Sequence, residues 1–492
     1  MFLLSDDWSG SDKWCTLELF SLGKSIVLFL CCVSEKMDLF ERASEEIKKE
    51  VLSRITPSKE DHDAMFQKID RLIVLVKEQL KSCSVSADVE LVGSTAKGTY
   101  LVGNMDVDVF LVFDRSVKRS VLATTALSIG RSLLSDTEEC YAEHPYIRGV
   151  FEGLKCEIVP CYRIGSADEL VSAVDRTPLH TSYVLEHLSL KQRDEVRLLK
   201  QFLKGIGCYG AEAEVEGFSG YLCEILILRF GSFDNVLLDA MSWSEKVKLS
   251  LSDESFSGFD GPLIFIDPVD SNRNVASALS VHRFEVFVKA ACEYVKKPLL
   301  SFFFPSEVVP WSCEKILSEL GSFCVVGLCF PKPSDLIAEN LYPQVRKSLK
   351  SIVELAERFD FVVDDSLYAI GDDTVYLILF VDETVLSKTR IHVGPPVAVE
   401  KNATDFKKKW QQDERTVRGP WVEDGRLFVE IKREYQDISS LLKNEVVVAS
   451  LGKDLDAVIR EKMMVCSMKD LVVEDLRRFW TLVLDDRFSW ER

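Results

Sequence analysis

The chain contains 492 residues, which is more than one hydrophobic core usually supports, so we expect about two to four domains. Hydrophobic residues make up 47% of the sequence and charged residues 28%, a balance that excludes a largely disordered protein. The formal net charge of −19 argues mildly against a nucleic-acid partner, because domains that bind nucleic acid are usually basic. Net charge nevertheless says little about the charge inside a single groove.

The fourteen cysteines do not follow the pattern of a disulfide-rich or zinc-binding protein. Cys156, Cys161 and Cys223 lie inside apolar runs, where cysteine behaves as a small hydrophobic residue. No Cys-x-x-Cys pair occurs, and the six histidines form no cluster with ligand spacing, which argues against structural zinc. We therefore expect reduced thiols and a cytoplasmic protein.

The first 36 residues differ in character from the rest of the chain. The apolar stretch 16–33 is interrupted by Glu18 and Lys24, which makes it a poor membrane span. Acidic residues also stand where a signal peptide would carry basic ones. We therefore expect no membrane association, and we interpret 1–36 as an upstream extension with initiation at Met37.

The next segment predicts two helices followed by a pair of strands. Apolar residues recur at helical spacing over 39–55 and 66–80, and Thr56-Pro57-Ser58 between them has the composition of a helix start. Segment 89–113 (VELVGSTAKGTYLVGNMDVDVFLVF) contains two strand-like runs on either side of a small, polar connector. A further helix is expected over 121–134.

Asp106 and Asp108 open the second of these strands. Because alternate side chains of a strand point to the same face, the two carboxylates project from one side. Like charges this close repel each other, and a divalent cation is the usual compensation, although a lone Asp-x-Asp on a turn is more often merely solvated. Gly93-Ser94, followed by Lys97, offers backbone N–H groups, a hydroxyl and an ammonium as a phosphate seat. Together these features predict phosphoryl or nucleotidyl transfer.

A predicted hairpin downstream carries a third carboxylate. Residues 147–151 and 154–162 read as two strands that turn at Gly153, and Glu157 lies in the second of them. If this strand lies beside the strand of the aspartate pair, Glu157 completes a cluster of three carboxylates. The alternative is an edge-strand glutamate that faces water.

From residue 174 the pattern becomes helical. Asp175-Arg176-Thr177-Pro178 predicts a helix start, and 195–206 carries an apolar stripe that leaves Lys200 and Lys204 off the core face. The run SGYLCEILILRF at 219–230 is apolar nearly all round. It predicts a central buried helix that belongs to the core and carries no chemistry.

The C-terminal part predicts a small α+β domain. Residues 264–276 indicate a strand that ends in a loop containing Arg273. Beyond Pro298 the order strand, helix, strand, strand suits an α+β sandwich, which is common among RNA-binding domains. The basic segment 405–412 predicts a helix whose default role is a solvated face and whose alternative role is contact with an RNA backbone. The other predicted elements are strands at 323–330, 361–363, 366–370, 375–381 and 427–431 and helices at 344–359, 451–463 and 470–484.

A family resemblance now becomes visible in these motifs. Gly93, Ser94 and Lys97, followed by Asp106 and Asp108, resemble the signature of polymerase β-type nucleotidyltransferases. Longer stretches resemble the archaeal (class I) CCA-adding enzymes, which are tRNA nucleotidyltransferases. These stretches are GSTAKGTYLVGNMDVDVFLVF, AEHPYIRGVFEGLKCEIVPCY, AVDRTPLH, EVRLLKQFLK and YGAEAEVEGFSGYLCE. The resemblance runs from about Met37 nearly to the C-terminus and is dense over 89–279.

The resemblance implies an α+β multidomain fold with a polymerase β-type palm, a helical central domain and a C-terminal α+β RNA-binding domain. It divides the chain, after the extension 1–36, into 37–174, 175–298 and 299–492. The implied activity is template-independent addition of C, C and A to tRNA 3′ ends, from CTP and ATP, with release of pyrophosphate. Members of the family often form dimers, so a homodimer is also an expectation.

The resemblance also assigns roles to individual residues. It implies that Asp106, Asp108 and Glu157 bind two Mg²⁺ ions, although the family usually has the shorter aspartate at the third position. The positions that contact the nucleotide are Ser94, Lys97, His180, Lys200, Tyr209 and Arg273, with His180 and Arg273 as candidates for choosing the base. Plainer roles for these residues are a solvated lysine at 200, a cap or core histidine at 180, a turn-packing tyrosine at 209 and, for Arg273, an ion pair with Asp267 or Asp270.

Two other functions remain open at this point. One is a different transferase of the same superfamily, such as a poly(A) polymerase or an oligoadenylate synthase. The other is a catalytically silent RNA-binding protein that keeps the fold, for which the glutamate at 157 is a warning sign.

Overall fold

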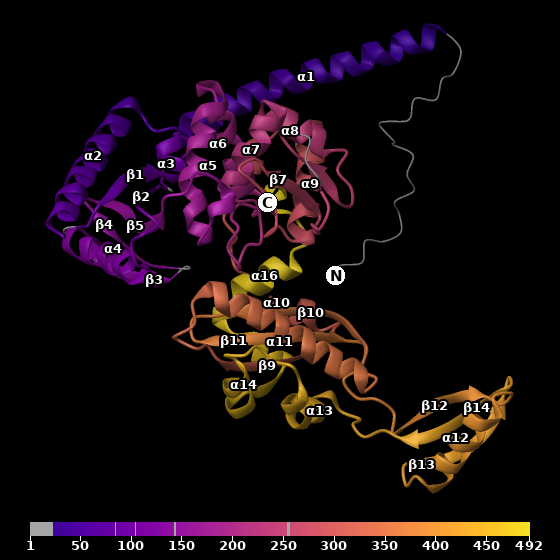
Figure 1. Ribbon diagram of the computed structural model, residues 1–492. Coiled ribbons are helices and arrows are strands. Elements are labelled where there is room, and N and C mark those ends of the chain that lie inside the picture. The colour runs from indigo at the N-terminus through magenta and orange to yellow at the C-terminus, as the bar shows by residue number, and fades with distance from the viewer. Residues whose placement is uncertain (1–22, 84, 104, 142–143, 253–255) are drawn as a thin grey trace. The chain divides into compact units, whose positions relative to one another are not determined.

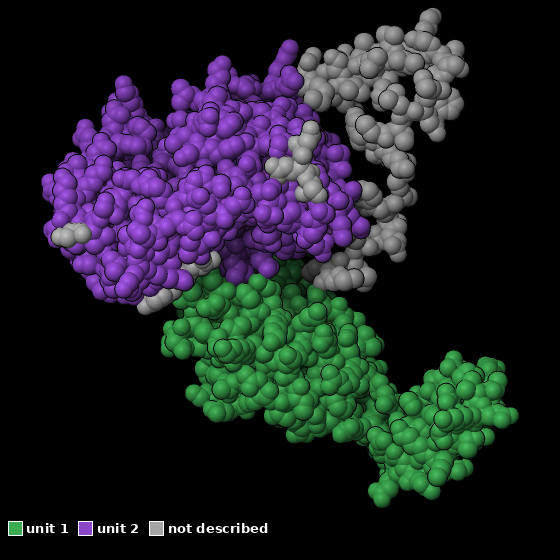
Figure 2. Space-filling model, viewed as in Figure 1, with its two compact units in different colours: residues 1–17, 307–486 green, residues 18–306, 487–492 purple. Residues whose placement is uncertain are grey.

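The described part of the chain forms two compact units, coloured separately in Figure 2. One unit contains the described residues up to Ser306 together with Arg487–Arg492, and the other spans Glu307–Asp486. No described helix is long and apolar enough to cross a membrane. Most of the segment 1–36 falls outside the described residues, so the interpretation of it as an extension stays a prediction. The computed structural model describes residues 23–83, 85–103, 105–141, 144–252 and 256–492.

A five-stranded mixed sheet organises the N-terminal part of the first unit (Figure 1). Its strand order is β1-β2-β5-β4-β3, in which β2 and β5 run parallel and the other neighbours run antiparallel. The helices α2 and α4 pack against it. The bounds are β1 Ala87–Val92, β2 Asp106–Phe113, β3 Ser135–Tyr141, β4 Pro145–Phe151, β5 Leu154–Tyr162, α2 Lys59–Ser82 and α4 Arg119–Leu133.

Strand alternation separates the two faces of this sheet. Val107, Val109 and Leu111 of β2 belong to the large core under α2 and α4. Phe110 and Val112, on the opposite face, belong to a much smaller apolar cluster. Because Asp106 and Asp108 share the parity of Phe110 and Val112, both carboxylates lie on the face that α2 and α4 do not cover.

The second half of the first unit is mainly helical, as the sequence predicted. Its core is rich in aromatic residues, and Phe202, Phe233, Tyr294 and Phe302 contact one another within it. The C-terminal Trp490 stacks on Phe302 with ring centroids 5.3 Å apart, which ties the chain end to this core. The elements are α1 Gly23–Ile55, α5 Arg176–His187, α6 Leu190–Gly205, α7 Gly220–Phe230, α8 Phe233–Ala240, α9 Val281–Lys296, β6 Val247–Leu249, β7 Leu263–Asp267 and β8 Asp270–Asn274.

The second unit is built around a four-stranded sheet of order β10-β11-β9-β15, with helices on both faces. One face packs against α11, α13 and α14, and the other against α10, α15 and α16. A separate three-stranded sheet of order β12-β14-β13 packs against the basic helix α12. The bounds are α10 Cys313–Leu320, β9 Cys324–Pro331, α11 Ala338–Arg358, β10 Val363–Ile370, β11 Thr374–Val381, β12 Thr389–Pro396, α12 Glu400–Gln412, β13 Thr416–Glu423, β14 Arg426–Lys432, α13 Ile438–Glu445, α14 Asp456–Lys462, β15 Met464–Ser467, α15 Met468–Leu471 and α16 Arg477–Leu484.

Most of the predicted elements are confirmed, and the exceptions have physical causes. The order strand, helix, strand, strand is present as β9, α11, β10 and β11. The expectation of a separate strand at 361–363 was wrong, because Phe361 is a buried residue between the turn that ends α11 and the start of β10, and Val363 already belongs to β10. Strand β3 was not predicted, because its sequence SDTEECY is polar and lies at the sheet edge, where alternation of apolar residues is not required.

Candidate active site

Parallel pairing of β2 with β5 brings the three predicted carboxylates into one neighbourhood. In this register Asp108 lies directly opposite Glu157, and Asp106 precedes Asp108 by two residues on the same face. The hairpin partner β4 places Arg148 opposite Glu157 on the other side. Arg148 donates from Nε to Glu157 Oε1 at 2.8 Å, and its Nη2 lies 2.6 Å from the same oxygen.

The charges on these carboxylates are not balanced. Burial raises the pKa of Asp108 to about 7, and repulsion from Glu157 and Asp106 adds to the effect, whereas Lys97 and Arg148 oppose it. Such a shift means that a further positive charge at this position would be stabilised. Carboxylate oxygens are the ligands that hard divalent cations prefer, so this donor set fits a metal such as Mg²⁺.

The three carboxylates are not arranged as a complete set of metal ligands. Within the described residues, no group of three or more His, Cys, Asp or Glu side chains is placed so that it could hold a metal ion. The ion pair with Arg148 occupies one carboxylate oxygen of Glu157, Oε1, and an ionised carboxylate has a second oxygen that can bind an ion.

Gly93 allows the connector to approach the carboxylates closely. Its φ of +73° suits glycine, and a Cβ atom there would stand 2.0 Å from Asp108 Oδ2. The connector continues as the short helix α3 (Gly93–Lys97), whose Thr95 Oγ1 donates to the carbonyl of Asp106 at 2.8 Å. These two contacts fix the position of α3 relative to the start of β2.

Six of the nine predicted site residues line a common cavity of about 280 Å³. The cavity lies on the sheet face that carries the aspartate pair. Ser94 of α3, Lys200 of α6 and Tyr209, which follows α6, supply part of the rest of its lining. The predicted residues in its lining are Ser94, Asp106, Asp108, Glu157, Lys200 and Tyr209. The remaining lining residues are Thr99, Tyr100, Leu101 and Glu212.

Lys97 and Lys200 are paired with a glutamate that the sequence analysis did not single out. Glu224, on the buried helix α7, accepts from Lys97 Nζ at 2.5 Å and from Thr99 Oγ1 at 2.6 Å. Lys200 Nζ lies 3.5 Å from Glu224 and also donates to Thr99. Lys97 is therefore directed toward α7 and does not line the cavity.

The expectation that Lys200 lies off the core face was wrong, since Lys200 is only 2% exposed. Its helix α6 is buried on two sides, and a single apolar stripe reveals only one of them. Lys204, in contrast, is exposed as predicted. The one acidic residue in an otherwise apolar helix, Glu224, was the available signal for a buried charge pair, because an unpaired carboxylate is rarely buried.

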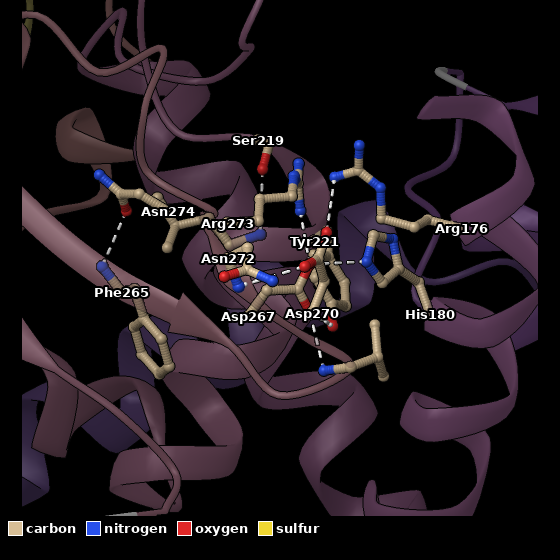
Figure 3. Close-up of polar contacts among 12 residues, drawn as sticks. Arg176, His180, Ser219, Tyr221, Phe265, Asp267, Asp270, Asn272, Arg273 and Asn274 are labelled. Atoms are coloured by element: carbon tan, nitrogen blue, oxygen red, sulfur yellow. Dashed lines mark hydrogen bonds and ion pairs between the residues drawn. The ribbon is translucent and has the colours of Figure 1, made fainter. Parts of the chain in front are cut away.

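His180 and Arg273 meet at a different carboxylate, Asp267, in the cluster drawn in Figure 3. His180 Nε2 and Arg273 Nη1 each lie 2.8 Å from Asp267 Oδ2. The ion pair between Arg273 and Asp267, weighed as an alternative from the sequence, is thus present. Neither residue lines the cavity described above, although the Tyr221 ring stacks on His180 and lies 5.8 Å from Lys97 Nζ.

Comparison with known proteins decides the family. CCA-adding enzymes of Methanosarcina barkeri and Thermoplasma acidophilum are 35% and 37% identical to this chain, over 86% and 83% of it and 94% and 92% of their own lengths. The chain belongs to the CCA-adding enzyme family. The enzyme of Methanocaldococcus jannaschii is also 37% identical, over 82% of this chain and 90% of its own length.

Family models agree along the length of the chain. The model of the nucleotidyltransferase domain matches 70–180, that of the second domain of tRNA nucleotidyltransferase matches 194–304, and that of the C-terminal domain of CCA-adding enzyme matches 321–468. The predicted family and the polymerase β-type fold class are thereby confirmed. Among solved structures, the Cid1 poly(U) polymerase aligns at a TM-score of 0.39 and 13% identity over 53% of this chain and 93% of its own, too low a similarity to bear on function.

Proposed function

We propose that this family member adds C, C and A to tRNA 3′ ends, consumes CTP and ATP, and releases pyrophosphate. The observation that carries the proposal is the single cavity that Asp106, Asp108 and Glu157 line together with Ser94 and Lys200. The relatives that share most of its length are CCA-adding enzymes. Neither a poly(A) polymerase nor a silent RNA-binding protein is favoured by these relatives.

The carboxylates would hold divalent metal ions, which nucleotidyltransferases typically use. We propose Mg²⁺, because Asp106, Asp108 and Glu157 offer oxygen ligands and an excess of negative charge. The chemistry that bound Mg²⁺ supplies is activation of the tRNA 3′-hydroxyl and neutralisation of charge on the departing pyrophosphate.

The other lining residues would position the nucleotide. The Ser94 hydroxyl and the Lys200 ammonium can donate to phosphate oxygens, and the Tyr209 ring can stack on a sugar or base. Lys97 would act indirectly, because its ammonium is bound to Glu224, which also pairs with Lys200. Fixed donors of this kind stabilise charge as it develops, without reorganisation during the reaction.

The second unit and the cell compartment complete the proposal. We propose that the exposed Lys407, Lys408 and Lys409 of α12 contact the tRNA backbone. We further propose a cytoplasmic enzyme that forms a homodimer, with domains at 37–174, 175–298 and 299–492. Each of the three matching family models lies mainly within one of these domains, which supports the division.

Incorporation assays with a tRNA that lacks its CCA end test the activity. Asp108→Ala should lower incorporation of CTP and ATP by at least about 1,000-fold and leave tRNA binding within a few-fold, because the carboxylate acts on the reacting groups and not on RNA affinity. Asp88→Ala is the matched control, since it removes an aspartate of the neighbouring strand β1 that pairs with Arg163 at the surface. Wild-type incorporation by the Asp108 variant would refute the proposal, and an enzyme that ignores CTP would indicate a poly(A) polymerase.

A further inference from the structure

The second unit contains a small module whose core is separate from that of the four-stranded sheet. This module, which we call the α12 module, consists of residues 389–432, that is β12, α12, β13 and β14. Its apolar core is formed by Phe406, Trp410, Val429 and Ile431, and none of these four belongs to the two cores of the four-stranded sheet. Figure 1 shows the module to one side of that sheet. Apolar packing alone therefore does not fix the orientation of the module.

The chain enters and leaves the α12 module through two segments that pair with each other. Residues 382–388 lead in and residues 433–437 lead out, and backbone hydrogen bonds join them as an antiparallel ribbon, which we call the neck. Leu386 and Tyr435 pack against the core of the four-stranded sheet and anchor the neck there. A ribbon of two strands twists more readily than a wider sheet, so the neck by itself restrains the module only loosely.

Asp360, which lies outside the module at the end of α11, adds a further restraint. Its Oδ1 accepts from Arg390 Nη1 at 2.7 Å, and its Oδ2 accepts from Arg433 Nη1. Arg390 lies in β12 and Arg433 directly follows β14, so each of the two chain crossings contributes one arginine. Because the two oxygens of one carboxylate are used separately, rotation of the module about the neck would break at least one of these ion pairs.

The backbone at Asp360 holds this carboxylate in a fixed place. Asp360 follows the C-cap residue Phe359 and has a φ of +72°, a conformation in which glycine is the usual residue. The next residue, Phe361, is 1% exposed, and its N–H donates to the Ala356 carbonyl at 3.1 Å. A residue kept in a strained conformation is a pointer to a role for its side chain, and here that side chain makes the two ion pairs.

The contact is made on the side of the module that carries α12. Arg390 lies opposite Ile431 in the sheet register, and Ile431 belongs to the core beneath α12. On α12 itself, Lys407 and Lys408 are exposed. In the described part of the chain neither lysine forms an ion pair, so both ammonium groups are available to phosphate oxygens. A fixed orientation of these donors would reduce the ordering cost of binding an RNA backbone.

We propose that Asp360 is a positioning residue for tRNA: through Arg390 and Arg433 it holds the α12 module, and with it the lysines of α12, in one orientation relative to the four-stranded sheet. This inference rests on the proposed function, because it takes the tRNA backbone as the ligand of α12. It assigns to one carboxylate, remote from the reacting groups, a share of the affinity for tRNA and none of the chemistry.

Asp360→Asn tests the inference, because asparagine keeps the shape, tolerates a positive φ and removes the charge. The KM for a tRNA that lacks its CCA end should rise about 3- to 10-fold, while kcat and the KM for CTP stay within about twofold. Asp456→Asn, which removes a carboxylate paired with Arg460 inside α14 of the same unit, should leave all three constants unchanged. An unchanged KM for tRNA in Asp360→Asn would overturn the inference.

A double-mutant cycle separates positioning from a merely structural role. The double substitution Lys407→Ala, Lys408→Ala should itself raise the KM for tRNA. Addition of Asp360→Asn to that background should raise it by less than about twofold further, because the lysines that Asp360 positions are gone. A further rise as large as in the wild-type background would show that Asp360 acts by another route and would overturn the inference.

A distance measurement on the wild-type sequence requires neither activity nor a folded Asp360 variant. Spin labels carried by noncanonical residues at Lys347 of α11 and Gln411 of α12, both exposed, report the orientation of the module by pulsed electron paramagnetic resonance. We expect one narrow distance distribution without tRNA and a broader one in Asp360→Asn. A broad distribution without the substitution would overturn the inference. Wild-type enzyme that incorporates neither CTP nor ATP would instead refute the proposed function, so the two failures are distinguishable.

Discussion

Replacement of Glu224 by glutamine should strongly destabilise the first unit. Glu224 is fully buried and is the shared acidic partner of Lys97 and Lys200, whose side chains are 8% and 2% exposed. Glutamine preserves the volume but leaves both lysines without an anion. Removing one partner of a buried ion pair typically costs about 3–5 kcal/mol of unfolding free energy, and we expect a loss in that range.

The pH dependence of the unfolding free energy lost in Glu224→Gln provides a check on the role of this carboxylate. Burial opposes ionisation of Glu224, but Lys97 and Lys200 outweigh it and hold its pKa below the ordinary 4.5. A carboxyl with a depressed pKa stabilises the folded state fully above its unfolded pKa and loses that contribution as the pH falls through the folded pKa. The difference between wild type and Glu224→Gln should therefore be constant near neutrality and should shrink below about pH 4.5.

Urea unfolding, with hydrogen exchange to assign the transition to the first unit, measures the effect. Asp234→Asn is the control, since the Lys48–Asp234 pair is more accessible, at 13% and 17% exposure, and should cost only about 1–2 kcal/mol. A loss below about 1 kcal/mol for Glu224→Gln, or a loss that persists unchanged into acid, would show that the two lysines do not depend on this carboxylate.

Two further changes test the geometry around the carboxylates. Gly93→Ala should lower kcat by at least about 100-fold, because the new Cβ would stand 2.0 Å from Asp108 Oδ2. Gly103→Ala is its control in steady-state assays, since Gly103 has a similar φ of +77° but no atom within 4 Å of the added Cβ; equal effects would contradict the reasoning. Arg148→Met should move the acidic limb of the pH–rate profile to higher pH, because Arg148 lowers the pKa of Asp108. If the acidic limb stays at the same pH or moves to lower pH, Arg148 does not lower the pKa of Asp108 in the active enzyme.

Local rules of strand geometry predicted the aspartate pair, and they left Glu157 as a third member only on the condition that its strand pairs with β2. Alternation along a strand places Asp106 and Asp108 on one face, and the Gly153 hairpin positions Glu157 to join them if its second strand pairs with β2. The register of Asp108 with Glu157 confirms that pairing. What strand geometry could not predict is the competing ion pair, because Arg148 acquires its position only when β4 pairs with β5.

The residue that sequence reasoning missed is the acidic partner of two lysines that it found. Glu224 lies in a segment that reads as core, and Lys200 and Lys97 come from 24 and 127 residues away along the chain. Asp267 was weighed as a partner of Arg273, six residues away, but its contact with His180, 87 residues away, was not predicted. Hydrophobic periodicity reports which face of a helix is buried, but it does not report which charges meet there. The pairing of Lys97 with Glu224 is therefore a property of the tertiary fold.

The balance of charge at the proposed site depends on these pairings and not on the composition. A net charge of −19 suggests a protein that repels a triphosphate. Two of the candidate cations are nevertheless held by buried carboxylates, Lys97 by Glu224 and Arg273 by Asp267, so they act as fixed dipoles more than as free charges. The carboxylates on the cavity wall remain under-compensated, as the raised pKa of Asp108 indicates. The proposed ligand is therefore a metal-bound nucleotide. Its metal ions would compensate the carboxylates and its phosphates would accept from the basic residues, whereas a free triphosphate would be repelled by the carboxylates.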